Sequence, residues 1–199
     1  MATGLTKNQI RTDVRAALSA IGTQEYQVKS QQICKFLKAM PLWSDLSVVH
    51  VFFPVIARRE PDIRPFISYL MSKGITIVLP VVRNFSRAPA SEPRLEHLAV
   101  SSMDDLIVNR WGISEPAHGK PQTLADIDVV VVPAVAADRK GNRLGNGFGY
   151  YDEFLEDMDC PRVCPILNKA YVEHVPSEPH DVGMTYIVTE SGTWDFSGT

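Results

Sequence analysis

The sequence has few cysteines. Only Cys34, Cys160 and Cys164 occur among its 199 residues, and three scattered thiols do not make the disulfide framework of a small secreted domain. Cys160 and Cys164 lie close together, but no further Cys or His pattern completes a zinc site beside them. Free thiols in a reducing compartment are the interpretation that fits this number and spacing.

Long hydrophobic runs are also missing. The sequence has no stretch of about 18 consecutive apolar residues of the kind that crosses a membrane. Residues 1–7 lack the apolar core of a signal peptide. We therefore expect a cytoplasmic protein without a membrane partner.

Nor is there an excess of positive charge. The chain carries 20 Lys and Arg residues against 23 Asp and Glu residues, which gives a formal net charge of -3. General nucleic-acid binders take most of their affinity from a basic surface. We therefore expect no nucleic-acid partner, although this average does not exclude local basic stripes.

Hydrophobic residues make up 45% of the sequence and charged residues 22%. This composition is typical of a globular domain with one hydrophobic core of ordinary size. Strand–helix–strand order predicts a parallel sheet. We expect a single α/β domain over residues 1–199, with a mostly parallel sheet flanked by helices on both faces and an N-terminal helical segment. The expected helices cover residues 7–20, 24–40, a segment through 66–71 that ends at Lys73-Gly74, and 150–158. The expected strands cover residues 48–53, 75–79 (stopped by Pro80), 95–100, 129–132, 162–167 and 186–189, and residues 83–94 form a loop.

The most informative stretch runs from Asp138 to Asp152 and reads DRKGNRLGNGFGYYD. It follows the apolar run 129–132 and leads into an expected helix, and a strand, a glycine-rich turn and a helix start together cradle phosphate in many proteins. The dinucleotide fingerprint needs a glycine where Tyr150 stands, and the P-loop needs a Lys-Ser/Thr pair that is absent. This pattern predicts a phosphate loop of another kind.

A basic row accompanies this loop in the sequence. Lys7, Arg11 and Arg15 are spaced four apart on the first expected helix, so they project to one side of it. A solvated basic face is the usual meaning of such a row on pattern alone. The dipeptide His180-Asp181 follows the turn at 176–179 near the other end of the sequence.

Taken in order, these segments resemble the 5-formyltetrahydrofolate cyclo-ligase family over nearly the whole chain. The most specific part is similar to the family signature D-x-x-G-x-R-L-G-x-G-x-G-Y-Y-D and spans Asp138 to Asp152. Weaker similarities are K-x-x-x-R from Lys7, E-x-D from Glu60, W-G-I-x-E-P from Trp111 and P-x-E-x-x-D ending at Asp181.

The resemblance implies an ATP-dependent ring closure. Members convert 5-formyltetrahydrofolate to 5,10-methenyltetrahydrofolate and release ADP and phosphate, with magnesium present. The formyl oxygen is a poor leaving group until it receives the γ-phosphoryl group, after which N10 attacks the carbon and phosphate departs. The protein mainly positions the groups and neutralises charge. The implied partners are ATP and 5-formyltetrahydrofolate, and we expect a monomer.

The resemblance also implies roles for particular residues. Arg143 and Asp152 would be catalytic, and Asp152 and Asp181 would hold Mg²⁺. The ATP-binding set is Lys7, Arg11, Arg15, Trp111, Arg143, Leu144, Gly145, Asn146, Gly147, Phe148, Gly149, Tyr150 and Tyr151. The substrate-binding set is Val55, Glu60, Asn146, Phe148 and Tyr150.

Each of these assignments has a structural alternative. Arg143 would otherwise be an exposed turn residue, and Asp152 a carboxylate favoured by the positive end of a helix dipole. Asp181 would form a turn, Glu60 would be a surface charge, and Trp111 would belong to the core or its rim. His180 receives no role and is left as structural.

Alternative functions stay open at the level of sequence. Asn146 and Phe148 stand where many members have glycine or a basic residue, and Ile63 and Ala170 replace a common Thr and Gln. These departures motivate one alternative, a catalytically inactive nucleotide-binding paralogue that acts as a binding module. Another is an ATP-dependent kinase or ligase acting on a different substrate. A dinucleotide oxidoreductase is disfavoured by the glycine spacing.

Overall fold

The structure is a computed structural model that describes residues 4–83, 95–109 and 112–198. Trp111 and nearly all of the expected loop at 83–94 lie outside these ranges. No helix in the described ranges has both the length and the apolar character needed to cross a membrane.

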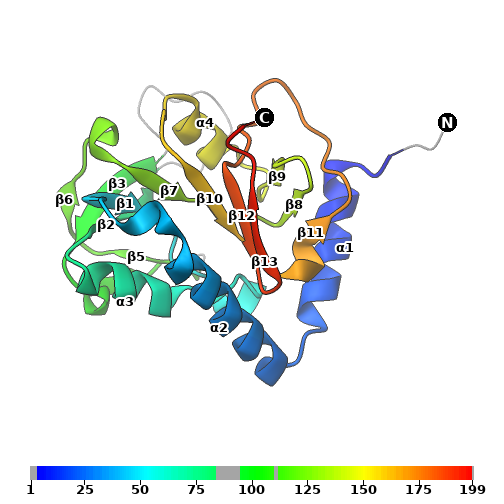
Figure 1. Cartoon of the computed structure of the whole chain (residues 1–199), viewed down its shortest axis with the longest axis horizontal. Coiled ribbons are helices and arrows are strands. Elements are labelled where there is room, and N and C mark those ends of the chain that lie inside the picture. The colour runs from blue at the N-terminus through cyan, green and yellow to red at the C-terminus, as the bar shows by residue number, and fades with distance from the viewer. Residues whose placement is uncertain (1–3, 84–94, 110–111, 199) are drawn as a thin grey trace.

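Four α-helices occur among the described residues, within a few residues of the positions expected (Figure 1). Residues Ile10, Val14 and Leu18 form the buried stripe of the first helix, and Thr6 begins it with a capping box to Gln9. The helices are α1 (Lys7–Ser19), α2 (Thr23–Ala39), α3 (Arg64–Ser72) and α4 (Tyr150–Glu156).

The main sheet has eight strands in the order β13-β12-β10-β7-β1-β2-β3-β6. The five inner strands from β12 to β2 pair in parallel, whereas β13, β3 and β6 join antiparallel at the two edges. The prediction of a mostly parallel sheet is therefore confirmed. The strands are β1 (Val48–His50), β2 (Thr76–Val82), β3 (Leu95–Val100), β6 (Lys120–Pro121), β7 (Val129–Val131), β10 (Arg162–Pro165), β12 (Tyr186–Thr189) and β13 (Gly192–Asp195).

Strand β2 does not stop at Pro80, as the sequence predicted, but continues to Val82. Pairing with β1 ends at Val78, while pairing with β3 continues through Pro80 and beyond. Proline lacks the backbone N–H of a ladder and is tolerated where a strand has lost one neighbour. Pro80 therefore lies in the part of β2 that is paired on one side only.

The expected direct passage from the strand at 129–132 into the glycine loop is also wrong. A hairpin of β8 (Ala136–Asp138) and β9 (Arg143–Leu144) intervenes and forms a small sheet with β11 (Tyr171–Val172). A further two-stranded sheet pairs β4 (Leu106–Val108) with β5 (Ser114–Pro116). The glycine loop thus leaves the small sheet, not the main one.

Buried Asp138 closes the turn of this hairpin. Its carboxylate accepts hydrogen bonds from the backbone N–H groups of Lys140 and Asn142, from the Asn142 side chain, and from the N–H of Val175, at 2.9–3.0 Å. Gly141 has a φ of 80°, a value that favours glycine over other residues. One side chain therefore ties the hairpin turn to the segment that follows β11.

The two faces of the main sheet have different partners. Successive residues of a strand point to opposite faces, and residues paired across strands point to the same one. Val49 and Ile77 are paired and belong to the large apolar core, and α3 and α2 contact β2 and β12. His50 points to the other face, where its ring lies 4.8 Å from the ring of Phe154 in α4. Helices thus cover both faces, as predicted.

His50 makes the stability of the fold dependent on pH. The side chain is fully buried, and neither ring nitrogen has a hydrogen-bond partner among the described residues. Burial, together with nearby His97, lowers the pKa of His50 well below its ordinary value, and burial lowers the pKa of His97 to about 4. Below pH 6.5 the unfolded chain therefore binds more protons than the folded protein, so acid favours unfolding.

We expect the free energy of unfolding to fall between pH 6.5 and pH 5 by up to about 2 kcal/mol for each buried neutral histidine. Urea denaturation at a series of pH values measures this slope. His50→Phe, which keeps a ring and removes the titrating group, is expected to reduce it, whereas His118→Gln at an exposed position leaves it unchanged. An equal slope in wild type and His50→Phe would contradict this explanation.

Candidate active site

A cavity of about 730 Å³ lies between the glycine loop, α1 and one face of the main sheet. Its apolar floor comes from the face to which His50 points. Pro80 and Val82 alternate along β2, Leu95 is paired with Val82 on β3, and Phe52 follows β1 on the same face. The alternation of the strands therefore gives the cavity one apolar wall.

The glycine loop forms a second wall of the cavity and contacts the guanidinium group of Arg11. Gly147 and Gly149 have φ values of 95° and 75°, in the left-handed region that favours glycine. A Cβ on Gly147 would lie 3.3 Å from the guanidinium carbon of Arg11. Nε of Arg11 donates to the carbonyl oxygen of Gly145 at 2.9 Å. The loop conformation and the position of α1 are thus coupled through Arg11.

Arg143 also lines the cavity, and its guanidinium group lies next to Gly145 of this loop. Its side chain is only 3% exposed, so the alternative of an exposed turn residue is wrong. Nη2 lies 2.5 Å from Oδ1 of Asp152, and Nη1 donates to the carbonyl oxygen of Pro133 at 3.2 Å. A buried charge is tolerated when it is paired and hydrogen-bonded in this way. Asp152, the third residue of α4, is 21% exposed and lines the cavity.

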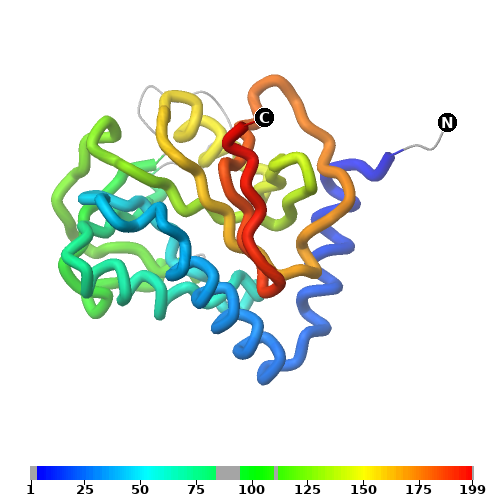
Figure 2. Tube along the Cα trace, in the orientation of Figure 1, coloured from blue at the N-terminus to red at the C-terminus, as the bar shows by residue number. Residues whose placement is uncertain are grey.

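Three charged side chains line the cavity near the start of α1, namely Lys7, Glu178 and Asp181. Nζ of Lys7 lies 2.7 Å from Oδ2 of Asp181 and 2.7 Å from Oε2 of Glu178. Burial acts to raise the pKa of Asp181, but hydrogen bonds from Lys7 and from the Glu178 N–H hold it below its ordinary value. Figure 2 shows the segment after β11 (orange) passing the start of α1 (blue), which is the approach that brings these residues together.

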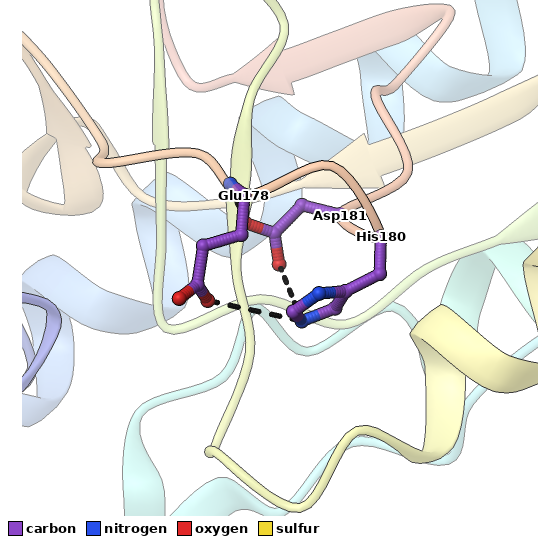
Figure 3. Close-up of side chains that lie close together, drawn as sticks. All are labelled: Glu178, His180 and Asp181. Atoms are coloured by element: carbon purple, nitrogen blue, oxygen red, sulfur yellow. Dashed lines mark hydrogen bonds and ion pairs between the residues drawn. The ribbon is translucent and has the colours of Figure 1, made fainter.

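The residues Glu178, His180 and Asp181 form a compact set of metal-ligating side chains (Figure 3). One ligand atom from each lies within 4.8 Å of the others. Nε2 of His180 is 3.7 Å from Oε2 of Glu178 and 3.9 Å from Oδ1 of Asp181. Carboxylate oxygens are the ligands that Mg²⁺ prefers, and Asp152 lines the same cavity. This set of donors fits a magnesium ion. When bound, the ion would interact with the carboxylates of Glu178 and Asp181, which also pair with Lys7.

Two of the residues expected to contact folate, Val55 and Glu60, lie on either side of the short helix η2 (Ile56–Arg58) in the sequence. Oε2 of Glu60 accepts a hydrogen bond from the N–H of Val55 at 2.8 Å across this helix. Burial raises the pKa of Glu60, against the lowering effects of that N–H group and of Arg58. Both Glu60 and Val55 line the cavity.

Two aromatic rings of the glycine loop complete the lining. The rings of Phe148 and Tyr150 stack with centroids 5.7 Å apart and an interplanar angle of 12°. Phe148 is 43% exposed although it is a large apolar residue. Flat aromatic surfaces in this arrangement suit a planar ligand.

This arrangement of glycine loop, basic residues and carboxylates agrees with comparisons with known proteins. A model of the 5-formyltetrahydrofolate cyclo-ligase family matches residues 4–190. The chain belongs to this family. The cyclo-ligases are enzymes that act on folate, and membership supports the ligase activity named for the family.

Individual relatives agree with this assignment. A 5-formyltetrahydrofolate cyclo-ligase of Mycolicibacterium smegmatis is 31% identical over 134 residues, which cover 65% of this chain and 68% of that protein. The protein of the same name from Escherichia coli K12 is 29% identical over 188 residues, which cover 92% of this chain and 100% of the relative.

Solved structures support the cyclo-ligase fold. The NMR structure of 5,10-methenyltetrahydrofolate synthetase from Aquifex aeolicus aligns with a TM-score of 0.81 at 26% identity, covering 98% of this chain and 95% of that one. The synthetase of Mycoplasma pneumoniae aligns with a TM-score of 0.72 at 19% identity over 94% and 99% of the two chains, which supports the fold alone.

The larger cavity gathers nearly all residues that the sequence singled out. Arg15 is an exception, because it lines a second, smaller cavity and its Nη2 donates to Oδ1 of Asn146 at 2.8 Å. Trp111 lies outside the described residues. The predicted residues that line the larger cavity are Lys7, Arg11, Val55, Glu60, Arg143, all of residues 144–152, and Asp181.

The sequence did not point to several other residues that line the larger cavity. Arg58 lines it from η2, and Glu178 and His180 line it beside Asp181. Glu178 is the acid of the P-x-E-x-x-D pattern, so that pattern contained a signal for it. For Arg58 and for the apolar floor no local signal exists, because the folding of the chain alone brings them to the loop.

Proposed function

We propose that this protein catalyses the ATP- and magnesium-dependent conversion of 5-formyltetrahydrofolate to 5,10-methenyltetrahydrofolate, with release of ADP and phosphate. The observation that carries the proposal is a single cavity with two chemically different sides. One side combines a glycine loop with the cations of Lys7, Arg11 and Arg143, and the other combines an apolar floor with Glu60. The first suits a triphosphate and the second a planar, partly apolar folate.

The proposed chemistry proceeds in two steps. The formyl oxygen of the folate attacks the γ-phosphorus of ATP, the bond to the β-phosphate oxygen breaks, and ADP leaves. The N10 nitrogen then attacks the activated carbon, the carbon–oxygen bond breaks with release of phosphate, and N10 loses its proton. No protein nucleophile takes part, so the protein contributes position and charge neutralisation.

On the nucleotide side, Lys7 and Arg11 from α1 would contact phosphate oxygens, and Arg143 would offset the charge that develops during transfer. Backbone N–H groups of residues 144–151 would line the phosphates. Asp152 and Asp181 would hold Mg²⁺, with Glu178 and His180 close by. When bound, that ion neutralises phosphate charge and orients the transferring group.

On the folate side, Glu60 and Val55 would contact the pterin at one end of the cavity. Phe148 and Tyr150 would cover its flat face, and Asn146 lines the same cavity. Adenine contact by Trp111 stays a prediction from the resemblance. The expected monomeric state and cytoplasmic location likewise stay predictions of the sequence.

Turnover tests this proposal directly. Purified protein is mixed with ATP, Mg²⁺ and 5-formyltetrahydrofolate, and the near-UV absorption band of the methenyl product is followed, with each component omitted in turn. A band that needs all three components supports the proposal. ATP binding without any band at high protein concentration would favour a nucleotide-binding paralogue, and ADP release with another substrate would favour a different kinase or ligase.

Lys7→Ala is expected to raise the KM for ATP by roughly tenfold, because it removes one charge-assisted contact to phosphate. The KM for the folate should change by less than about twofold, since Lys7 lies at the nucleotide side. Steady-state kinetics with each substrate varied in turn measure both values. Lys35→Ala, an exposed lysine on α2, serves as the control. An effect confined to the folate KM would contradict the role given to Lys7.

A further inference from the structure

The buried side of helix α2 carries three side chains with polar or thiol groups. Tyr26, Ser30 and Cys34 are spaced four residues apart, so they lie on one side of the helix. Each of them is at most 4% exposed. Burying a hydroxyl without a hydrogen bond costs free energy, whereas burying an apolar side chain does not. The buried hydroxyl groups of this stripe therefore require partners.

All three groups bond to the backbone of one short segment. The Tyr26 hydroxyl donates to the carbonyl oxygen of Glu60 at 2.6 Å. Oγ of Ser30 accepts a hydrogen bond from the N–H of Asp62 at 3.1 Å, and Sγ of Cys34 donates to the carbonyl oxygen of Asp62 at 3.3 Å. The stripe on α2 thus fixes the backbone of the segment that begins with Glu60.

The residue before Glu60 has an unusual backbone conformation. Arg59 has a φ of 57°, in the left-handed region that is disfavoured for a long side chain. Such a conformation persists where the surroundings enforce it. The guanidinium carbon of Arg59 lies 5.0 Å from the centroid of the Tyr26 ring, a distance at which a cation is attracted to an aromatic face. Tyr26 therefore contacts Arg59 with its ring and Glu60 with its hydroxyl.

After this turn the side chain of Glu60 returns across η2. Its Oε2 accepts a hydrogen bond from the N–H of Val55, and the charge of Arg58 acts on the same carboxylate. Glu60 lines both cavities. The bond from Tyr26 holds the backbone that carries this carboxylate, so a shift of that backbone would move the carboxylate within the cavity lining.

The Tyr26 hydroxyl keeps its proton at neutral pH. Burial raises the pKa of Tyr26 to about 12, and the Asp62 carboxylate acts in the same direction. The phenol is therefore a hydrogen-bond donor throughout the physiological pH range. A phenylalanine would fill nearly the same space in the core, so what the hydroxyl adds is the position of Glu60.

We propose that Tyr26 is a positioning residue of the folate site, and that it places the Glu60 carboxylate by holding the backbone at Arg59 and Glu60. This inference rests on the proposed function. Ser30 and Cys34 support the same segment from the next two turns of α2. Tyr26 does not belong to the described lining of either cavity, so it acts on a ligand only through the segment that it holds.

Tyr26→Phe is expected to weaken the binding of 5-formyltetrahydrofolate by roughly three- to tenfold, the usual effect of losing one hydrogen bond. Calorimetric titration measures this affinity. The KM for ATP should change by less than about twofold, because the nucleotide residues do not contact this segment. Tyr69→Phe is the matched control, since Tyr69 lies on α3 outside the lining of both cavities, and it should leave the folate affinity unchanged.

A double-mutant cycle separates positioning from a general loss of packing. In Glu60→Ala no carboxylate remains to be placed, so adding Tyr26→Phe should weaken folate binding by less than about twofold. An equal loss of affinity in both backgrounds would refute the inference, because Tyr26 would then act independently of Glu60. An unchanged folate affinity in Tyr26→Phe alone would refute it as well.

Amide hydrogen exchange tests the inference without folate, ATP or turnover. The N–H of Val55 is held by the Glu60 carboxylate, so Tyr26→Phe should speed its exchange several-fold, while the amides of the inner strand β7 stay unchanged. Turnover together with wild-type exchange at Val55 in Tyr26→Phe would refute the positioning role and leave the proposed function intact. Faster exchange in a protein without turnover would support the positioning of Glu60 and contradict the proposed function.

Ser30→Ala is the second variant, should Tyr26→Phe fail to fold. It removes the acceptor of the Asp62 N–H from the same segment. The folate affinity should fall and the exchange at Val55 should rise, as in Tyr26→Phe. No change in either quantity would refute the inference.

Discussion

Asp152→Asn is expected to lower magnesium-dependent turnover by at least about 100-fold, because it removes a charge from the proposed metal and phosphoryl-transfer site. The side chain lines the cavity and is ion-paired with buried Arg143. An asparagine keeps an oxygen that can accept from Arg143, so the free energy of unfolding should fall by less than about 1.5 kcal/mol. Turnover at several Mg²⁺ concentrations and urea denaturation measure the two effects separately.

The matched control for this variant is Glu156→Gln. Glu156 is an exposed carboxylate one turn further along α4 and does not line the cavity. Its replacement should leave both turnover and its magnesium dependence unchanged. If Asp152→Asn turned over at the wild-type rate, Asp152 would have no metal role and its carboxylate would serve only to pair Arg143.

Asp138→Ala is expected to lower the free energy of unfolding by about 3–5 kcal/mol, since it leaves several buried donors without an acceptor. The carboxylate is fully buried and accepts from three N–H groups of the backbone and one side-chain amide. These bonds fix the hairpin from which the glycine loop leaves. Urea denaturation measures the loss, and reduced nucleotide binding should accompany it.

Asp195→Ala provides the comparison for this variant. Asp195 is exposed, and its Oδ1 accepts a hydrogen bond from the N–H of Ser197 at 2.8 Å. Its loss should cost far less than the loss of the Asp138 carboxylate, because water can replace the bond at an exposed position. Should Asp138→Ala prove too unstable to purify, Asp138→Asn, which keeps one acceptor oxygen, should fall between the two. A cost for Asp138→Ala as small as that for Asp195→Ala would show that the turn does not depend on this carboxylate.

Local patterns predicted the helices well. The stripe of Ile10, Val14 and Leu18 defines the buried side of α1, and Gly74, with a φ of 80°, follows α3 where a C-cap glycine was expected. Such signals act within one or two turns of the chain, so the sequence contains them fully. Pro80 was misjudged because the cost of a proline in a strand depends on which neighbouring strand is present, and that is settled by the whole sheet.

The candidate site was predictable where a motif carried it and not elsewhere. The resemblance placed Lys7 and Asp181 in one site, yet no local pattern shows that residues 174 positions apart form an ion pair. The burial of Arg143 was equally hidden, because its cover comes from α4 and from the backbone at Pro133. No spacing pattern in the sequence marks Arg58 and Arg59, because only the folded chain brings these residues to the cavity that they line.

The contact between α1 and the turn at residues 178–181 joins two segments that are synthesised at different times. During synthesis Lys7 emerges long before Glu178 and Asp181, so a growing chain at first lacks the two carboxylates that pair with Lys7. The carboxylates that balance Lys7 arrive with the segment that leads into β12, an inner strand of the main sheet. This group of charged side chains is therefore completed only after the segment that leads into β12 has been synthesised.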